Sequence, residues 1–158
     1  MAGENPTRRY KWFRPRQAYR GAITLSGPVN NATLLLNNNS TGPLIIVVRD
    51  FLVVTTAAHL IAVAAFNGTL GSSGGTITPM ISGEAQGPGV LYSVDDSTTR
   101  IADYYVAAQL NQPQWRHDFP FQILQPGQSV LFQDTTGAET MRLAILWEAI
   151  YSDELDWA

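Results

Sequence analysis

Few residues of this sequence have the type and spacing that catalysis requires. Gly71–Gly75 reads Gly-Ser-Ser-Gly-Gly and formally matches the Gly-x-Ser-x-Gly pattern of a serine nucleophile. That motif needs a strand before it, a helix after it and a later histidine as the base. Here it is surrounded by a Gly/Ser-rich loop and a short strand. We therefore interpret the segment as a flexible loop.

The two histidines, His59 and His117, are not at metal-ligand spacing. His59 lies in an apolar run, which predicts a core or edge residue with one hydrogen bond. Asp118 could orient His117, but no nucleophile is evident beside them. We interpret His117 as a polar loop residue, one that could also act as a pH-sensitive contact.

Oxygen and sulfur ligands are equally sparse. The run from Asp95 to Thr98 could supply oxygens to calcium, but its spacing does not match an EF-hand loop, and such clusters are ordinary turn material. The chain has no cysteine, which excludes a thiolate nucleophile, a zinc–thiolate site and a disulfide. We predict a protein that is not an enzyme and that has no cofactor or metal.

Charge is concentrated at the beginning of the chain. Residues 1–20 hold six of the ten basic residues and one acid, a net charge of +5, whereas residues 21–158 hold four basic residues and twelve acids, a net charge of −8. Aromatic side chains alternate with the cations, and Pro6 and Pro15 discourage a helix. This predicts an extended basic and aromatic arm over 1–20 and a β-sandwich domain with an acidic C-terminal tail over 21–158.

Three interpretations of the arm compete: a solvated tail, a nucleic-acid contact through phosphates and stacked bases, and docking on an acidic protein surface. The aromatic content argues against a disordered tail. Trp, Tyr and Arg are typical of interface hot spots, so we favour docking, with the acidic tail as one possible counterpart. The predicted partner-binding residues are Arg8, Arg9, Lys11, Trp12, Phe13, Arg14, Arg16, Tyr19, Arg20, Asp153, Glu154, Asp156 and Trp157.

The sequence after the N-terminal arm predicts β-strands. Apolar segments alternate with turn formers at roughly 8–12 residue spacing. The expected strands are 22–25, 33–36, 44–55, 76–81, 90–94, 101–107, 119–124, 129–133 and 141–150. Leu44–Thr55, interrupted only by Arg49 and Asp50, predicts a strand buried on both faces, and Ala57–Phe66 fits a short helix nearly as well as a strand.

This pattern predicts an all-β, jelly-roll-like antiparallel β-sandwich. The composition agrees: 15% of the 158 residues are charged, against roughly 25% in ordinary soluble domains. No apolar run approaches the roughly 18 residues of a membrane span, so we expect no membrane contact. The Asn-x-Ser/Thr triplets, at Asn31, Asn38, Asn39 and Asn67, are interpreted as turn chemistry.

Two C-terminal stretches resemble small bacteriophage virion proteins. Residues 119–130, with the sequence FPFQILQPGQSV, resemble their turn into a strand, and residues 143–150, with the sequence LAILWEAI, resemble their closing strand. The resemblance covers about the last forty residues. It implies a jelly-roll virion component, of the capsid cement (decoration) type or a related collar or fibre module, which is usually a trimer or lies at a symmetry axis.

We therefore expect a structural virion protein, made in the host cytoplasm, that binds the major capsid protein or other virion subunits and stabilises the head shell. A homotrimer or other homo-oligomer is expected. One alternative is a tail, collar or receptor-binding fibre module that binds glycan through Tyr104, Tyr105 and Trp115. Another is a capsid protein whose basic arm contacts packaged nucleic acid.

Overall fold

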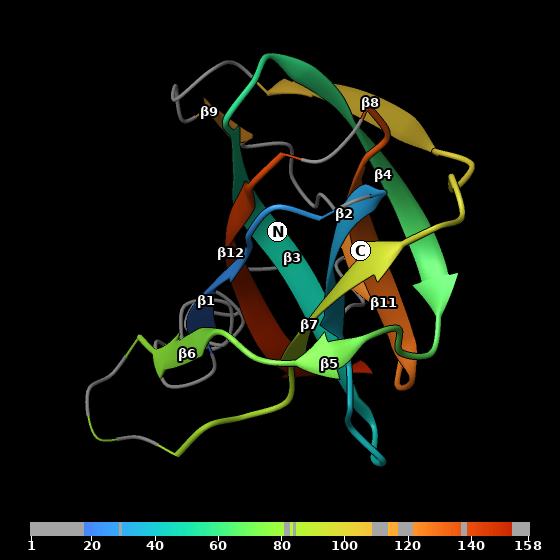
Figure 1. Ribbon diagram of the computed structural model, residues 1–158. Helices are drawn as coiled ribbons and strands as arrows, with labels where there is room; N and C mark the ends of the chain where they lie inside the picture. Colours follow the sequence, from blue (N-terminus) through green and yellow to red (C-terminus); the bar gives the residue numbers. More distant parts are fainter. Residues whose placement is uncertain are drawn as a thin grey trace, which may run out of the picture.

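The chain folds into two antiparallel β-sheets that pack face to face (Figure 1). The computed structural model describes residues 18–28, 30–80, 83, 85–108, 114–116, 122–136 and 139–152, with backbone alone at 108 and 114–116. The strands are β1 (Ala18–Leu25), β2 (Asn31–Asn37), β3 (Leu44–Thr55), β4 (His59–Asn67), β5 (Ser72–Ser73), β6 (Thr76–Pro79), β7 (Val90–Asp96), β8 (Tyr104–Ala108), β9 (Gln114–Arg116), β10 (Gln122–Leu124), β11 (Gln128–Asp134) and β12 (Met141–Tyr151).

Eight of the described strands pair as a jelly roll. β1 pairs with β12, β2 with β11, β3 with β10 and β4 with β8, which is the nested pattern of one long hairpin. Rolling up that hairpin brings β12 beside β3 and β11 beside β4. Sheet A then has the order β10-β3-β12-β1-β6, with β9 also beside β3, and sheet B has the order β5-β7-β2-β11-β4-β8. The predicted all-β, jelly-roll-like sandwich is confirmed.

The segment between β4 and β8 adds three strands to this plan. β6 extends sheet A beside β1, whereas β7 extends sheet B beside β2 and carries β5 on its other side. Figure 1 shows the three strands together along one side of the sandwich. The predicted flexible loop at 71–75 therefore contains a short strand, because Ser72 and Ser73 pair with Ser93 and Tyr92.

Apolar side chains from alternate strand positions fill the space between the sheets. The largest of them are Trp147 on β12, Phe51 on β3 and Phe132 on β11, and the two phenylalanine rings lie 5.0 Å apart. Leu143, Ile145 and Trp147, at alternate positions of β12, join this core. Burying each such side chain stabilises the fold by about 1.5–3 kcal/mol.

β3 is buried on both faces over its first half, as its apolar sequence predicts. Ile46 and Val48 face the core, and Ile45 and Val47 are buried on the outer face of sheet A. The register between β3 and β12 shifts at Leu146/Trp147, so Arg49 becomes the extra residue of a β-bulge. The polar interruption of the apolar run is therefore the point where the strand bends.

Several strand ends differ from the expected ones by one to three residues, and three larger differences concern the segment 57–66, β9 and β1. The ambiguous segment 57–66 forms the strand β4, because it is held between β11 and β8. β9 was missed, since Gln114–Arg116 has no strand-like pattern of its own and is placed by its pairing with β3. β1 begins at Ala18, so residues 18–20 belong to the sandwich and not to an arm.

Candidate functional site

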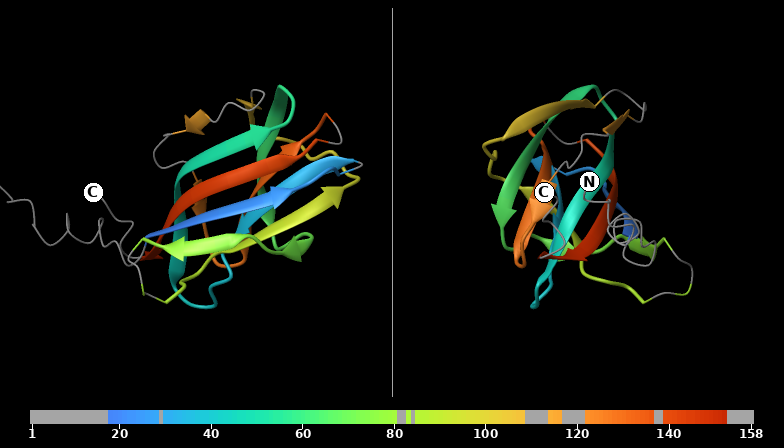
Figure 2. Two further views of the ribbon diagram at one scale, coloured as in Figure 1. Left: turned by 60° about the vertical axis from the view of Figure 1, so that its left-hand side comes forward. Right: turned by 180° about the vertical axis from the view of Figure 1, so that it is seen from behind.

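The points where the arm and the tail join the sandwich lie on neighbouring strands. Ala18, the first residue of β1, pairs with Glu148 near the end of β12. Ser152, the last described residue after β12, donates its backbone N–H to the carbonyl of Pro43 at 3.0 Å. The chain therefore enters β1 and leaves β12 at the same end of the sandwich. Figure 2 shows the paired strands β1 and β12 along one sheet.

Two of the predicted partner-binding residues lie in β1, on opposite faces of the sheet. Arg20 is exposed on the outer face of sheet A. Tyr19 is buried in the core, with its ring centroid 6.0 Å from that of Trp147. The side chain of Tyr19 therefore packs in the core and is not exposed to a partner. Alternation along the strand explains this, since neighbouring residues point to opposite faces.

The remaining predicted partner-binding residues lie outside the described residues. In the arm they are Arg8, Arg9, Lys11, Trp12, Phe13, Arg14 and Arg16, and in the tail they are Asp153, Glu154, Asp156 and Trp157. His117 and Asp118 also lie outside the described residues.

A half-buried ion pair lies on the outer face of sheet A, next to the base of the arm. Glu148 accepts hydrogen bonds from Nε and Nη2 of Arg49, at 3.1 and 2.6 Å. The bulge aims Arg49 at this carboxylate, because the extra residue takes no regular place in the ladder. Arg20 and Arg142 are exposed on the same face. The outer face of sheet A is therefore mixed in charge along β1 and β12.

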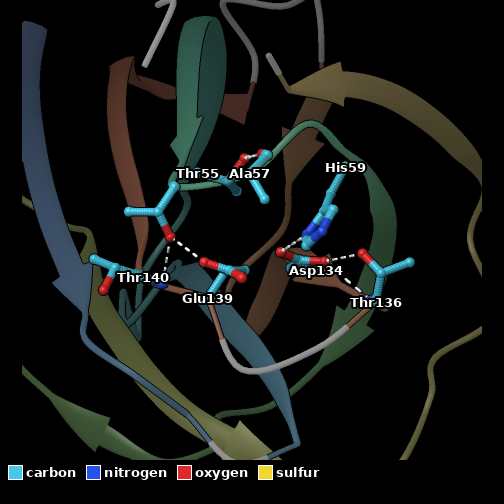
Figure 3. Close-up of polar contacts among 8 residues, drawn as sticks. Thr55, Ala57, His59, Asp134, Thr136, Glu139 and Thr140 are labelled. Atoms are coloured by element: carbon cyan, nitrogen blue, oxygen red, sulfur yellow. Dashed lines mark hydrogen bonds and ion pairs between the residues drawn. The ribbon is translucent and has the colours of Figure 1, made fainter. Parts of the chain in front are cut away.

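The opposite end of the sandwich carries a polar cluster formed by two turns (Figure 3). Asp134, which ends β11, is fully buried and lies 2.7 Å from Nδ1 of His59, the first residue of β4. Its other oxygen accepts hydrogen bonds from the backbone N–H and the hydroxyl of Thr136. Beside it, Thr56 bonds to Glu139, and Thr140 donates its N–H to the hydroxyl of Thr56 at 3.3 Å.

This cluster orients a histidine but shows no sign of a nucleophile. A catalytic triad needs a hydroxyl or thiol hydrogen-bonded to the second ring nitrogen. Among the described residues, no hydroxyl is bonded to Nε2 of His59. Both oxygens of Asp134 are used to hold the β3–β4 and β11–β12 turns together. The chemistry that the arrangement supports is structural, as expected for a histidine with one hydrogen bond.

A second polar cluster replaces the calcium site considered from the sequence. Nε of Arg100 lies 2.7 Å from a carboxylate oxygen of Asp96, and its guanidinium lies 5.5 Å from the ring centroid of Phe66 on β4. Gln133 of β11 accepts the N–H of Arg100 and donates to the carbonyl of Thr98. The segment between β7 and β8 therefore crosses the outer face of sheet B, and Asp96 holds it by binding an arginine.

The asparagine run after β2 anchors the turns at the end where the termini leave. Asn37 and Asn38 are buried. Nδ2 of Asn37 donates to the carbonyl of Gly68 and to the hydroxyl of Ser129, and Nδ2 of Asn38 donates to the carbonyls of Leu44 and Leu124. The two buried amides thus donate to backbone carbonyls of three other segments. At Asn38, the interpretation as turn chemistry fits this geometry.

Two large apolar side chains are exposed on the outer face of sheet B. Leu60 of β4 and Tyr105 of β8 have relative exposures of 54% and 57%. Tyr104 and Tyr105 lie on β8, whereas Trp115 lies on β9 beside β3 in the other sheet. The structure therefore does not bring the three residues of the expected glycan-binding face together on one loop.

Comparisons with protein-family models, with curated proteins and with solved structures find no match. Within the described part of the chain, no cluster of three or more His, Asp or Glu residues is placed to hold a metal. A search of the same residues finds no helix with the length and apolarity to cross a membrane. The site is thus defined by the geometry of this sandwich alone.

Sequence reasoning missed the most connected polar residues. Asp134 and Gln133 lie in an ordinary strand segment, and their partners, His59 and Thr98, are 75 and 35 residues away. No local pattern marks such pairs, because the topology alone makes them neighbours. A detectable signal was present at Gln133 and Asp134, where two polar residues follow the apolar run of residues 130–132.

Proposed function

We propose that the chain is a structural virion protein of a bacteriophage, a capsid cement protein that binds the head shell through its basic arm and through contacts between subunits. Its partner is the major capsid protein or another virion subunit. The body acts as a rigid platform, and many weak contacts on a symmetric shell add up to strong attachment. The role is not enzymatic.

The observation that carries the proposal is the exit of the arm and the tail from neighbouring strands at one end of a jelly roll. Residues 1–17, with a net charge of +4, thus precede β1 at the same end of the sandwich where a tail with three acidic residues follows β12. This polarises one end of the body and gives it a complementary pair of segments for neighbouring subunits. Jelly rolls occur in viral capsid and lectin domains, so the architecture agrees with the role but does not select it.

The test is binding to head shells of the virus that encodes the chain, prepared without this protein. A variant with Arg8, Arg9, Lys11, Arg14 and Arg16 replaced by glutamine should lose co-sedimentation with the shells. Arg142→Gln, which removes an exposed cation of the body, is the control and should bind as the unaltered chain does. Full decoration by the arm variant would overturn the proposal.

The same assay separates protein docking from genome contact. Empty and DNA-filled shells should bind equally if the arm contacts capsid protein. Binding that occurs only on DNA-filled shells, with a steep loss on adding salt, would contradict the cement role and favour an arm on nucleic acid.

A further inference from the structure

The four edges of the two sheets are not equally protected against pairing with another strand. An exposed edge strand presents unpaired N–H and C=O groups, and proteins usually protect such edges with short strands, proline or charge. In sheet A the edge strands are β6, which ends in Pro79, and β9 and β10, which have three residues each. In sheet B one edge is β5, with two residues.

β8 is the exception among these edges. It is the last strand of sheet B, and it has five residues, Tyr-Tyr-Val-Ala-Ala, without a charge or a proline. Val106 faces the core, so Tyr105 and Ala107 point to the outer face of the sheet. Leu60 and Tyr105, two large exposed apolar side chains, lie on this face beside the edge.

We propose that β8 pairs with β8 of a second copy of the chain about a two-fold axis at Val106, which joins two B sheets into one continuous sheet. The inference concerns how copies of the body associate and does not depend on the proposed shell-binding role. A two-fold contact uses the same surface on both copies, so β8 must be complementary to itself.

The sequence of β8 meets that requirement. In an antiparallel pair centred on Val106, Tyr104 lies opposite Ala108 of the second copy and Tyr105 lies opposite Ala107. Tyrosine positions thus lie opposite alanine positions, and no like charges meet across the axis. A register moved by two residues would place either Tyr105 opposite Tyr105 or Ala107 opposite Ala107 at the axis, and the match of large with small residues would be lost.

The same pairing covers the exposed apolar residues beside the edge. Leu60 is opposite Ala107 within one copy, and Ala62 is opposite Tyr105. Neighbouring strands lie about 4.8 Å apart. On the outer face of the joined sheet, a row of side chains perpendicular to the strands therefore runs from Leu60 to Ala107 in one copy. It continues to Tyr105 and Ala62 in the second copy. Leu60 and the second copy's Tyr105 then close over the small Ala107 between them.

The test is the mass of the full chain in solution, measured by sedimentation across a concentration series. The unaltered chain should form dimers. Tyr105→Lys should weaken the dimer about tenfold or more, because it puts a charge on the edge and removes the cover over Ala107. Tyr151→Lys, at a similarly exposed tyrosine of β12, is the matched control and should leave the dimer unchanged.

A charge pair tests the register itself. Ala107→Glu alone should also weaken the dimer. Tyr105→Lys combined with Ala107→Glu should restore it, because residue 105 of one copy lies opposite residue 107 of the other and the two charges attract. Circular dichroism should show the same folded spectrum for every variant, since both positions are exposed.

Disulfide formation gives a second readout. The chain has no cysteine, and Tyr105→Cys with Ala107→Cys should crosslink two copies on oxidation. The two cysteines of one copy are alternate residues of a strand and lie too far apart to bridge. A chain that stays monomeric throughout the series, or an oligomer that Tyr105→Lys and Ala107→Glu leave intact, would overturn the proposal.

Discussion

Asp134 holds two turns together at one end of the sandwich. One of its carboxylate oxygens lies against His59 of β4, and the other accepts two hydrogen bonds from Thr136 in its own turn. The residue is fully buried, so a missing partner would be costly there. At the scale of single residues, the buried polar groups of this protein connect turns.

Removing this carboxylate should therefore destabilise the whole fold. Asp134→Ala is expected to lower the free energy of unfolding by about 2–3 kcal/mol, since it leaves Thr136 and His59 without their acceptor. His59→Ala should cost less, because that side chain is partly exposed. Chemical denaturation of the two single variants and the double variant measures the coupling.

The expected coupling between His59 and Asp134 is about 1 kcal/mol. The control is Glu139→Ala, which removes a carboxylate of the same end that is not fully buried. Equal losses for Asp134→Ala and Glu139→Ala would contradict a special role for Asp134.

Sequence reasoning was most limited at this scale. Tyr19 was grouped with the arm because of its aromatic neighbours. In the structure it is the second residue of β1, on the strand face that points to Trp147 in the core. Composition reports which residue types are near in sequence, whereas burial depends on which face of a strand a residue occupies. The same limit applies to Asp96, whose partner Arg100 lies outside the Asp/Ser/Thr run in which calcium ligands were considered.

At the scale of elements, the segment between β4 and β8 closes one edge of the jelly roll. The residue just before β7 approaches the core so closely that only glycine fits. Gly89 has a φ of +125°, and a Cβ there would lie 2.8 Å from the ring of Trp147. The indole N–H of Trp147 donates to the carbonyl of Pro88 at 3.0 Å, which fixes the segment on the core.

Gly89→Ala should therefore be destabilising by more than backbone strain alone. Gly68 also has a positive φ, +93°, but a Cβ there meets nothing within 4 Å, so Gly68→Ala is the matched control. In both variants the alanine must adopt a positive φ, which costs about 1 kcal/mol of stability. Gly89→Ala adds overpacking against Trp147, about 1–3 kcal/mol. Thermal unfolding compares them, and equal midpoints would contradict the close approach.

Long strands were predictable and short ones were not. Leu44–Thr55 was predicted with the bounds that the structure shows, because ten of its twelve residues are apolar or β-branched. β5 and β9 have two and three residues, which is too short to show a period-two pattern in the sequence. They are strands because they pair with β7 and β3. The helix alternative for 57–66 failed because pairing on both sides overrides local propensity.

At the scale of the whole molecule, the boundary between arm and body lies before Ala18. The expectation placed it after residue 20, where the run of basic residues ends. The charge pattern predicted a distinct N-terminal segment, but strand pairing with β12 determines where the body begins. The jelly-roll plan itself was predictable, because turn signals at regular spacing and the lack of long helices leave few other architectures.

The boundary predicts different results for two truncations. A chain that begins at Ala18 should keep the thermal midpoint of the full chain. A chain that begins at Gly21 loses Tyr19 from the core, at a cost of about 3–5 kcal/mol, and should melt about 10 °C lower. Differential scanning calorimetry checks both. Equal midpoints for the two truncated chains would place the boundary after residue 20 instead.

The most direct test of the proposed role is a cryo-electron microscopy map of the assembled particle, with the surroundings of Trp12 and Arg14 as the quantity observed. The account predicts that both side chains lie within contact distance of a neighbouring virion subunit, with acidic groups near Arg14. Density of packaged nucleic acid around them, or an arm that contacts no other subunit, would contradict it.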